Sequence, residues 1–387
     1  MRLNPKFSLH RIYQRKGETL VCKVIIYGAG SIGNHLAHAC RDKGWDVVMT
    51  DIDPDALKRT REDIYPSRYG VWDTGIRLRG MDALPNEHFN VVIIGTPPDT
   101  HVNLAIQVLK NSSPEVLLIE KPLCNPFLDG VQEIVELQKT TGSFVAVGYN
   151  HTLTENSRRA ARILKQNWIG DPITISARFR EHWGGIFSAH PWLSGPKDTY
   201  LGFFERGGGA SGEHSHAINI WQHFARLVGA GRIVEVSAAM DIVNDGVVKY
   251  DRICLINVKT EAGLVGNIVQ DVVTEPAQKA ARIQGAKGFL EWFVNFTSGH
   301  DAVHYRDGKG EVREELIKKI RPDDFKGEVD HIEQILNGED RADSPISIER
   351  GLDTMLVIAA AHMSYRHKRS VRIDYDRGYN SEAIELL

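Results

Sequence analysis

The chain has 387 residues, 42% of them hydrophobic and 25% charged, and its formal net charge at pH 7 is −3. This length exceeds one ordinary hydrophobic core and the composition is typical of a globular protein, so we expect two domains. The chain does not have the excess of positive charge that is typical of nucleic-acid-binding proteins. It also contains no apolar run long enough to span a membrane. We therefore expect neither nucleic acid nor a membrane as partner.

Two features bear on where the protein is located. Residues 1–20 carry five Lys or Arg and one Glu but no continuous apolar core of a secretory signal, so we expect an N-terminal tail or a short packed arm. Cys22, Cys40, Cys124 and Cys254 form no C-x-x-C pair. This pattern favours a reducing, cytoplasmic location and argues against a disulfide framework or a structural zinc site.

A glycine-rich motif opens the first domain. The apolar run Val24–Tyr27 predicts a buried parallel strand, and Gly28, Gly30 and Gly33 follow it at G-x-G-x-x-G spacing. Gly28 would let the chain turn sharply, Gly30 would let a pyrophosphate approach the backbone, and Gly33 would let the next helix pack closely. The alternative is that these glycines only shape turns.

The residues after the glycines favour a dinucleotide site. A helix predicted over 32–42 would present free N–H groups to the phosphates, near Ser31 and Ile32. A second strand, 46–50, ends at Asp51, where a carboxylate would accept hydrogen bonds from the adenosine ribose. Because that carboxylate would repel a 2′-phosphate, NAD is favoured over NADP.

Strand and helix patterns alternate to about residue 150. This alternation predicts an α/β domain over 21–150 with a parallel, doubly wound sheet. The stretch 65–79 shows no clear strand. Further strands are predicted at 91–94, 116–119 and 144–147, and helices at 54–64, from Asp99 as N-cap to about 110, and at 126–140.

Polar and glycine-containing segments follow the predicted strands. In doubly wound sheets, ligands bind beyond the carboxyl ends of the strands. We therefore expect one crevice to be lined by 28–33, Asp51, 96–98, 120–122 and 149–150.

The pattern changes over 151–387, where several strands alternate apolar and polar residues. This predicts an α+β second domain with a mostly antiparallel sheet, one face of which a second subunit would cover. The last helices are expected to pack back on the first domain. The predicted strands are 173–180, 233–240, 251–260, 264–272, 281–284 and 371–373, and the predicted helices are 157–168, 325–336 and 348–365.

Several motifs together resemble the glucose–fructose oxidoreductase / inositol dehydrogenase (Gfo/Idh/MocA) family. The resemblance covers about residues 22–375. It rests on the glycine loop 28–33, Thr96-Pro97-Pro98-Asp99-Thr100-His101, Glu120-Lys121-Pro122, Gly148-Tyr149-Asn150, the segment 207–216 and the closing helix from Ser347 to Ser364.

The resemblance implies a Rossmann domain, a second domain with a large open sheet, and an NAD(P)-linked oxidoreductase acting on sugars or polyols. It also implies homodimers or homotetramers packed through that sheet. Besides the glycine loop and Asp51, the cofactor-binding residues are then expected to include Thr96, Pro97, His101, Glu120, Lys121 and Asn150.

Oxidation of a secondary alcohol needs a base for the hydroxyl proton and a donor that steadies the developing oxygen charge. Lys121, at a strand end, can supply the positive donor, and Glu120 can orient it. The alternative for Lys121 is an exposed surface lysine.

The family places its acid/base histidine on a helix after a glycine-rich loop, which identifies His216 here. It usually has Asp four residues earlier and Asp three residues later, but this chain has Gly212 and Asn219 there. Glu213 or His214 would then replace the missing carboxylate partner. A satisfied, partly buried histidine is the alternative for both histidines.

A metal site is a weaker hypothesis for the same segment. Glu213, His214 and His216 could combine with His182 or His190, but residues two apart on a helix face different directions. We therefore expect no metal.

Substrate contacts are expected from the strand-end residue Tyr149, from Asn219 and from the aromatic- and glycine-rich segment 181–206 with its neighbours. Trp183 could form an apolar platform under a sugar ring, although packing within the loop is as good an interpretation. Arg178 could meet a phosphate or carboxylate. The family often has arginine where this chain has His151.

The sequence thus predicts an NAD-dependent oxidoreductase that transfers hydride between nicotinamide and a carbon of a small, sugar-like substrate. One alternative is an NAD-using glycosidase, in which the cofactor oxidises the sugar only transiently. Another is a non-catalytic ligand sensor on the same fold.

Overall fold

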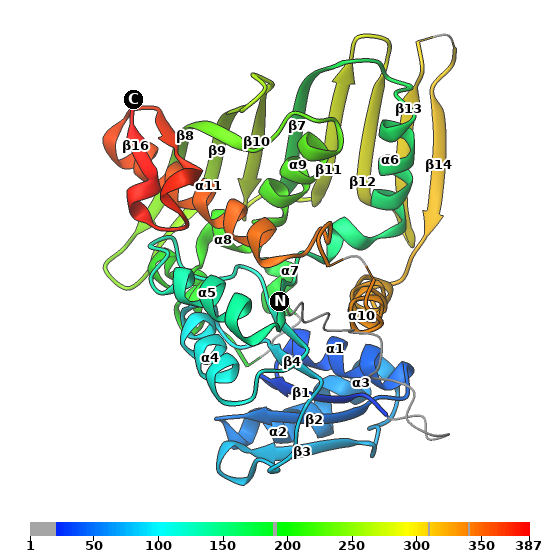
Figure 1. The fold of residues 1–387 in the computed structure, drawn as a ribbon, viewed down its shortest axis with the longest axis vertical. Coiled ribbons are helices and arrows are strands. Elements are labelled where there is room, and N and C mark those ends of the chain that lie inside the picture. The colour runs from blue at the N-terminus through cyan, green and yellow to red at the C-terminus, as the bar shows by residue number, and fades with distance from the viewer. Residues whose placement is uncertain (1–20, 189–191, 309, 340) are drawn as a thin grey trace, which may run out of the picture.

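The computed structural model describes residues 21–188, 192–308, 310–339 and 341–387. The N-terminal tail predicted over 1–20 and His190 lie outside these described residues. Figure 1 shows two sheets, one in each half of the molecule, with the first part of the chain below and the larger sheet above.

The first sheet has six parallel strands in the order β3-β2-β1-β4-β5-β6. This confirms the doubly wound α/β domain, and β3 lies in the stretch where no strand was clear. Its sequence, Ile-Arg-Leu-Arg-Gly, alternates apolar and charged residues over only five positions, which is a weak signal. The strands are β1 Lys23–Tyr27, β2 Asp46–Asp51, β3 Ile76–Gly80, β4 Val91–Ile94, β5 Val116–Ile119 and β6 Phe144–Val147.

Two helices of this domain differ from prediction. The helix predicted over 54–64 is interrupted, because a π-helical turn over Thr60–Ile64 separates α2 from α3. The helix predicted from 126 begins at Val131, since Leu128 and Gly130 have φ angles of 64° and 76°, outside the helical range. The helices are α1 Ser31–Asp42, α2 Pro54–Arg59, α3 Tyr65–Tyr69, α4 Pro98–Asn111 and α5 Val131–Thr141.

The predicted cap at Asp99 is wrong. Pro97 occupies the N-cap position and Pro98 begins α4, so Asp99 lies in the first turn of the helix. Its carboxylate instead accepts a hydrogen bond from Arg206 at 2.7 Å.

The second sheet has ten strands in the order β14-β13-β12-β11-β7-β10-β9-β8-β15-β16. Within this sheet, β7 and β10 are the one pair of described strands that run parallel, which confirms a large, mostly antiparallel sheet. The strands are β7 Pro172–Arg180, β8 Ile233–Asn244, β9 Lys249–Thr260, β10 Val265–Asp271, β11 Gln278–Gly285, β12 Phe289–Thr297, β13 His300–Arg306, β14 Arg313–Lys318, β15 Val371–Ile373 and β16 Ile384–Leu386.

Four of these strands, β12, β13, β14 and β16, were not predicted. The sequence of β14, Arg-Glu-Glu-Leu-Ile-Lys, consists of residues that form helices well. It is a strand because it pairs along the edge with β13. Such pairing is a long-range contact, which the helix and strand propensities of single residues do not describe.

Helices cover one face of the large sheet (Figure 1). α9 packs against β7, α6 against β12 and β13, and α11 against β8. The opposite face exposes apolar side chains such as Leu255 and Val265, which are 44% and 53% exposed. The helices of this part are α6 Glu155–Lys165, α7 Gly184–Ser188, α8 Gly209–Glu213, α9 His216–Leu227, α10 Asp323–Leu336 and α11 Ile348–His367.

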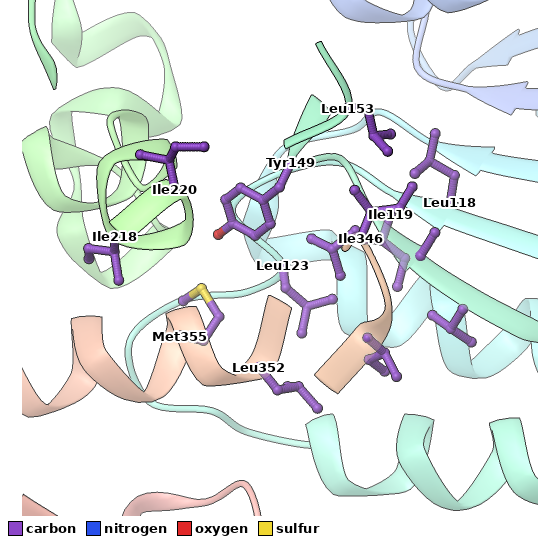
Figure 2. Packing of buried hydrophobic residues seen from close by; sticks show 14 of the residues in the cluster. Leu118, Ile119, Leu123, Tyr149, Leu153, Ile218, Ile220, Ile346, Leu352 and Met355 are labelled. Carbon is purple, nitrogen blue, oxygen red and sulfur yellow. The ribbon is translucent and has the colours of Figure 1, made fainter. Parts of the chain in front are cut away.

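One continuous hydrophobic core joins the two sheets. Figure 2 shows Tyr149, just after β6, between Ile220 on α9 and Leu123 beyond β5, with Leu352 and Met355 of α11 below them. The backbone N–H of Val147 also donates to the carbonyl of Ile346 at 2.8 Å. The carboxyl ends of β5 and β6 are therefore held against the second domain.

Candidate active site

The glycine loop between β1 and α1 is shaped by close backbone contacts. Gly28 has a φ of +107°, and a Cβ there would lie 2.5 Å from the carbonyl oxygen of Gly95. A Cβ on Gly33 would lie 2.1 Å from the carbonyl oxygen of Gly28. In contrast, no described atom lies within 4 Å of a Cβ built on Gly30. The loop therefore leaves open space at Gly30, beside the first N–H groups of α1, as a pyrophosphate requires.

Ser31, at the start of α1, is held by a residue that the sequence did not indicate. The guanidinium of Arg68 donates to the Ser31 carbonyl and to its Oγ, both at 2.8 Å. Arg68 comes from α3, so its approach depends on the unpredicted path of the chain after α2. It adds a positive charge beside Ile32 and the helix N-terminus, where an anion would bind.

Asp51, the last residue of β2, faces the glycine loop. Its Oδ2 accepts from the Ala29 N–H at 2.8 Å, and its Oδ1 accepts from the Asp53 N–H at 2.9 Å. Arg59 in turn pairs with Asp53 at 2.9 Å. Two carboxylates thus lie at the end of β2.

His101 connects two strand ends rather than facing the crevice. It is 1% exposed; its Nε2 lies 2.6 Å from the Thr96 carbonyl oxygen and its Nδ1 lies 3.1 Å from that of Pro122. Thr96 and Pro97 are the residues between β4 and α4. Both ring nitrogens of His101 are therefore occupied by the chain itself, and this residue positions the loops.

Lys121, directly after β5, is paired with Glu213. Its Nζ donates to the Glu213 backbone carbonyl at 3.0 Å and to Glu213 Oε2 at 3.2 Å, and Tyr200 Oη donates to the same oxygen at 3.5 Å. The Lys121 side chain is 13% exposed, which excludes the alternative of a surface lysine. Burial would raise the pKa of Glu213, but the nearby charges of Lys121 and His214 hold it below its usual value. Glu213 therefore remains a carboxylate.

His216 begins α9 in an aromatic enclosure. Its ring centroid lies 4.6 Å from that of His151, 5.5 Å from Tyr149 and 6.1 Å from Phe179. Burial, together with the charges of His151 and Lys121, lowers the pKa of His216 well below its usual value. At neutral pH the imidazole is uncharged and able to accept a proton.

His214 and Glu120 are buried residues, each adjacent in sequence to one member of the Lys121–Glu213 pair. His214 Nε2 has no hydrogen-bond partner in the described part of the chain, and burial lowers the pKa of His214 to about 4. Glu120 Oε1 likewise lacks a partner among the described residues, and burial raises the pKa of Glu120 to about 7. Glu120 Oε2 accepts from the Lys121 backbone N–H at 3.3 Å.

Of the other predicted contacts, Asn150 lies directly beyond β6, in the short helix Asn150–Leu153, beside His151. Trp183 instead packs in a small separate core, with its ring 4.7 Å from that of Tyr250. Arg178 is exposed, because alternation along β7 places it on the face opposite Phe179. Asn219 turns toward α11, where its amide donates to Thr354 at 3.2 Å. Arg178 therefore lies on the opposite face of β7 from Phe179, which stacks with His216. Asn219 lies three residues after His216 on α9, about one helical turn away.

A lysine that the sequence analysis missed lies at the site. Lys279 on β11 is directly opposite Phe179 in the sheet register, so both side chains share the face under His216. Its Nζ pairs with Glu181 at 2.6 Å. The charge of Lys279 contributes to the lowered pKa values of His214 and His216. Finding it required the register of β11 against β7, which the sequence alone does not supply.

No group of three His, Cys, Asp or Glu side chains arranged to hold a metal ion is found in the parts of the chain that the structure describes. No helix within those parts is long and apolar enough to cross a membrane.

A glycine loop at a helix N-terminus, followed by an acid at the end of the next parallel strand, is typical of a dinucleotide-binding domain. Comparison with protein families agrees. Residues 22–149 match the model described as "Oxidoreductase family, NAD-binding Rossmann fold", and residues 157–291 match the Gfo/Idh/MocA C-terminal domain. The chain belongs to the Gfo/Idh/MocA oxidoreductase family. NAD is its cofactor, and the open space at Gly30 fits the pyrophosphate of that group.

Solved structures share the fold at low sequence identity. An oxidoreductase from Agrobacterium radiobacter in complex with NAD+, L-tartaric acid and magnesium is 18% identical, with a TM-score of 0.70 over 91% of this chain and 98% of that one. The WlbA dehydrogenase from Bordetella pertussis, with NADH and UDP-GlcNAcA, is 16% identical, with a TM-score of 0.66 over 91% and 99%. Aldose-aldose oxidoreductase from Caulobacter crescentus, complexed with glycerol, is 18% identical, with a TM-score of 0.69 over 91% and 100%. No curated protein matches the chain.

Proposed function

We propose that this protein is an NAD-dependent dehydrogenase or reductase that interconverts a carbinol and a keto carbon on a sugar, sugar derivative or cyclitol. The observation that carries this proposal is the Lys121–Glu213 pair directly after β5, together with the pKa of His216, which burial and the Lys121 charge lower. Solved relatives bind UDP-GlcNAcA, L-tartaric acid and glycerol, which supports a small polyhydroxylated substrate.

The chain's own residues divide the work as follows. Lys121 donates to the substrate oxygen and stabilises its developing negative charge. His216, uncharged at neutral pH, takes the hydroxyl proton in the oxidative direction and returns it in the other. Glu213 holds the Lys121 ammonium in place through its carboxylate and its backbone carbonyl. When bound, NAD accepts or returns the hydride.

Preference for NAD over NADP is supported by the carboxylates at the end of β2. Asp51 and Asp53 both lie there, and two negative charges would repel a 2′-phosphate. Arg59, the nearby cation, is already paired with Asp53.

Assembly into homodimers or homotetramers is part of this proposal. The helix-free face of the large sheet exposes Leu255 and Val265 in the isolated chain, and a second copy packed there would cover them. A cytoplasmic location is supported by the four cysteines, none of which forms a disulfide with another described residue.

The direct test is a difference titration with NAD and NADP, followed by a sugar and cyclitol panel read near 340 nm, roughly the band of reduced nicotinamide. The proposal predicts tighter binding of NAD and net NADH formation with at least one polyol. Tight NAD binding with glycoside cleavage but no net absorbance change would overturn it in favour of the redox-cycling glycosidase. Ligand binding without any turnover would indicate the sensor.

A further inference from the structure

A cavity lies on the helical side of the large sheet. Its volume is about 560 Å³, and its walls come from α6, α9, α10, α11 and the segment before α11. Among the described residues, neither Lys121, Glu213 nor His216 lines it. A cavity of this size is typical of small-molecule sites, and no step of the proposed reaction uses it.

Three helices each present a polar stripe to this cavity. Arg158 and Lys165, seven residues apart, come from α6, and Gln222 and Arg226, four apart, come from α9. Arg350 on the first turn of α11 completes the wall. Because residues three, four or seven apart share a helix face, the polar groups converge on one space.

The cavity carries an excess of positive charge. Arg226 pairs with the buried Asp353 at 3.1 Å, so these two charges balance. Arg158, Lys165 and Arg350 form no ion pair with any described residue, and one further carboxylate, Asp343, lines the cavity. Two cations are therefore uncompensated. A phosphate monoester carries about −1.5 to −2 charges at neutral pH, which matches this excess.

Neutral hydrogen-bonding groups adjoin the cations. The Gln222 amide donates to the Asp353 carbonyl at 3.3 Å and its oxygen accepts from Thr354 at 3.1 Å, so its second amide N–H is the group left for a ligand. His223, beside it on α9, has its pKa lowered to about 4 by burial and by Arg226 and Lys165, so its imidazole is uncharged at neutral pH. Such groups suit the hydroxyls of a polyol.

We propose that this cavity binds a phosphate monoester of a small polyol, with the phosphate held by Arg158, Lys165 and Arg350. Arginine forks bind phosphate oxygens in pairs, which a lysine supplements as a point charge. α9 begins at His216 and carries Gln222 and Arg226 into the cavity, so a bound ligand contacts the helix that presents the catalytic histidine. Binding of the phosphate monoester does not depend on the proposed dehydrogenase function. Only an effect of this ligand on turnover rests on that function.

The test is calorimetric titration of the NAD-saturated full chain with inorganic phosphate and with glycerol 3-phosphate, at constant ionic strength. Saturation with NAD keeps both probes out of the glycine loop. We expect saturable binding at millimolar concentration or tighter, on the scale where a Kd of 1 mM is about −4.1 kcal/mol. Tighter binding of glycerol 3-phosphate identifies a phosphorylated polyol, whereas the absence of saturable binding by both probes overturns the proposal.

Variants locate the binding. Arg158→Gln/Lys165→Gln should weaken binding at least about tenfold, and Arg350→Gln should do the same independently. The matched control is Arg162→Gln, on the same helix, exposed and outside the cavity lining. Equal affinity of the wild type and both lining variants would overturn the proposal. Turnover measured without added phosphate should be unchanged in Arg158→Gln/Lys165→Gln, so a failure here is distinct from a failure of the proposed reaction.

Discussion

Lys121 and Glu213 are joined twice, through the Glu213 carboxylate at 3.2 Å and through its backbone carbonyl at 3.0 Å. Packing in the same segment explains the glycine at position 212, where the family resemblance leads us to expect Asp. A Cβ on Gly212 would lie 2.1 Å from the Gly207 carbonyl oxygen, so no side chain fits there. The carboxylate of the adjacent Glu213 pairs with Lys121.

Replacing this carboxylate should impair turnover without affecting the cofactor. Glu213→Gln removes the charge that holds the Lys121 ammonium, and a charge-assisted hydrogen bond contributes about 1.5–3 kcal/mol. We expect kcat/KM to fall roughly 10- to 150-fold, with the Kd for NAD unchanged. Glu205→Gln, an exposed glutamate nearby, is the control. Wild-type kcat/KM in Glu213→Gln would contradict the role assigned to the pair.

The packing at Gly212 predicts a stability effect. Gly212→Ala forces a methyl group against a backbone oxygen and should cost about 1–3 kcal/mol of unfolding free energy. Gly185→Ala, where no described atom lies within 4 Å of the added Cβ, should cost much less. Urea unfolding of both variants measures the difference, and equal costs would show that 212 is not close-packed.

Substitutions in the glycine loop can distinguish a glycine needed for packing from a glycine needed for NAD binding. Gly30→Ala adds a methyl group to open space, so stability should stay within about 1 kcal/mol of wild type, while NAD binding weakens at least about tenfold. Gly33→Ala should destabilise the fold itself, because its Cβ would meet the Gly28 oxygen at 2.1 Å. Thermal unfolding and NAD titration on both variants check this. NAD affinity unchanged in Gly30→Ala would place the pyrophosphate elsewhere.

The buried histidines predict acid sensitivity of the cofactor-free protein. The pKa of His214 is about 4 in the folded chain against 6.5 for the free side chain, so between these values the unfolded chain binds the extra proton. The contribution of His214 to the free energy of unfolding is therefore fully present above about pH 6.5. It is lost as the pH falls toward 4, at up to about 1.4 kcal/mol per pH unit.

Unfolding free energies at pH 7.5 and 5.5 measure this effect. In His214→Gln the loss between the two pH values should be smaller than in wild type by about 1 kcal/mol. His367→Gln, at the exposed end of α11, should keep the wild-type difference. An identical pH dependence in His214→Gln and wild type would mean that His214 is already solvated.

The sequence predicted the first domain well because its strands are short, continuous apolar runs separated by turn residues. Val91–Ile94 and Val116–Ile119 are buried at every position, as predicted. Strands β12 to β14 could not be predicted in the same way. The charged edge strand β14 is defined by its pairing with β13, which is a long-range contact.

In the candidate site, too, local motifs could be predicted, whereas residues placed by long-range contacts could not. Motif spacing indicated Lys121, Glu213 and His216; the structure pairs Lys121 with Glu213, and burial and the charge of Lys121 lower the pKa of His216. The sequence also suggested Arg178 as a substrate contact, but alternation along β7 puts Arg178 on the exposed face. Trp183 stays a prediction: it packs in a small core with Tyr200, whose hydroxyl donates to Glu213. Lys279 and Arg68 were missed because each reaches its place through tertiary packing.

The measurement that tests the central claim most directly is single-turnover hydride transfer by Lys121→Met, with NAD affinity measured in the same preparation and Lys110→Met, an exposed lysine on α4, as control. The account predicts that Lys121→Met binds NAD with wild-type affinity and loses hydride transfer by about a hundredfold or more, while Lys110→Met retains both. Hydride transfer at the wild-type rate in Lys121→Met would contradict the assignment of the active site.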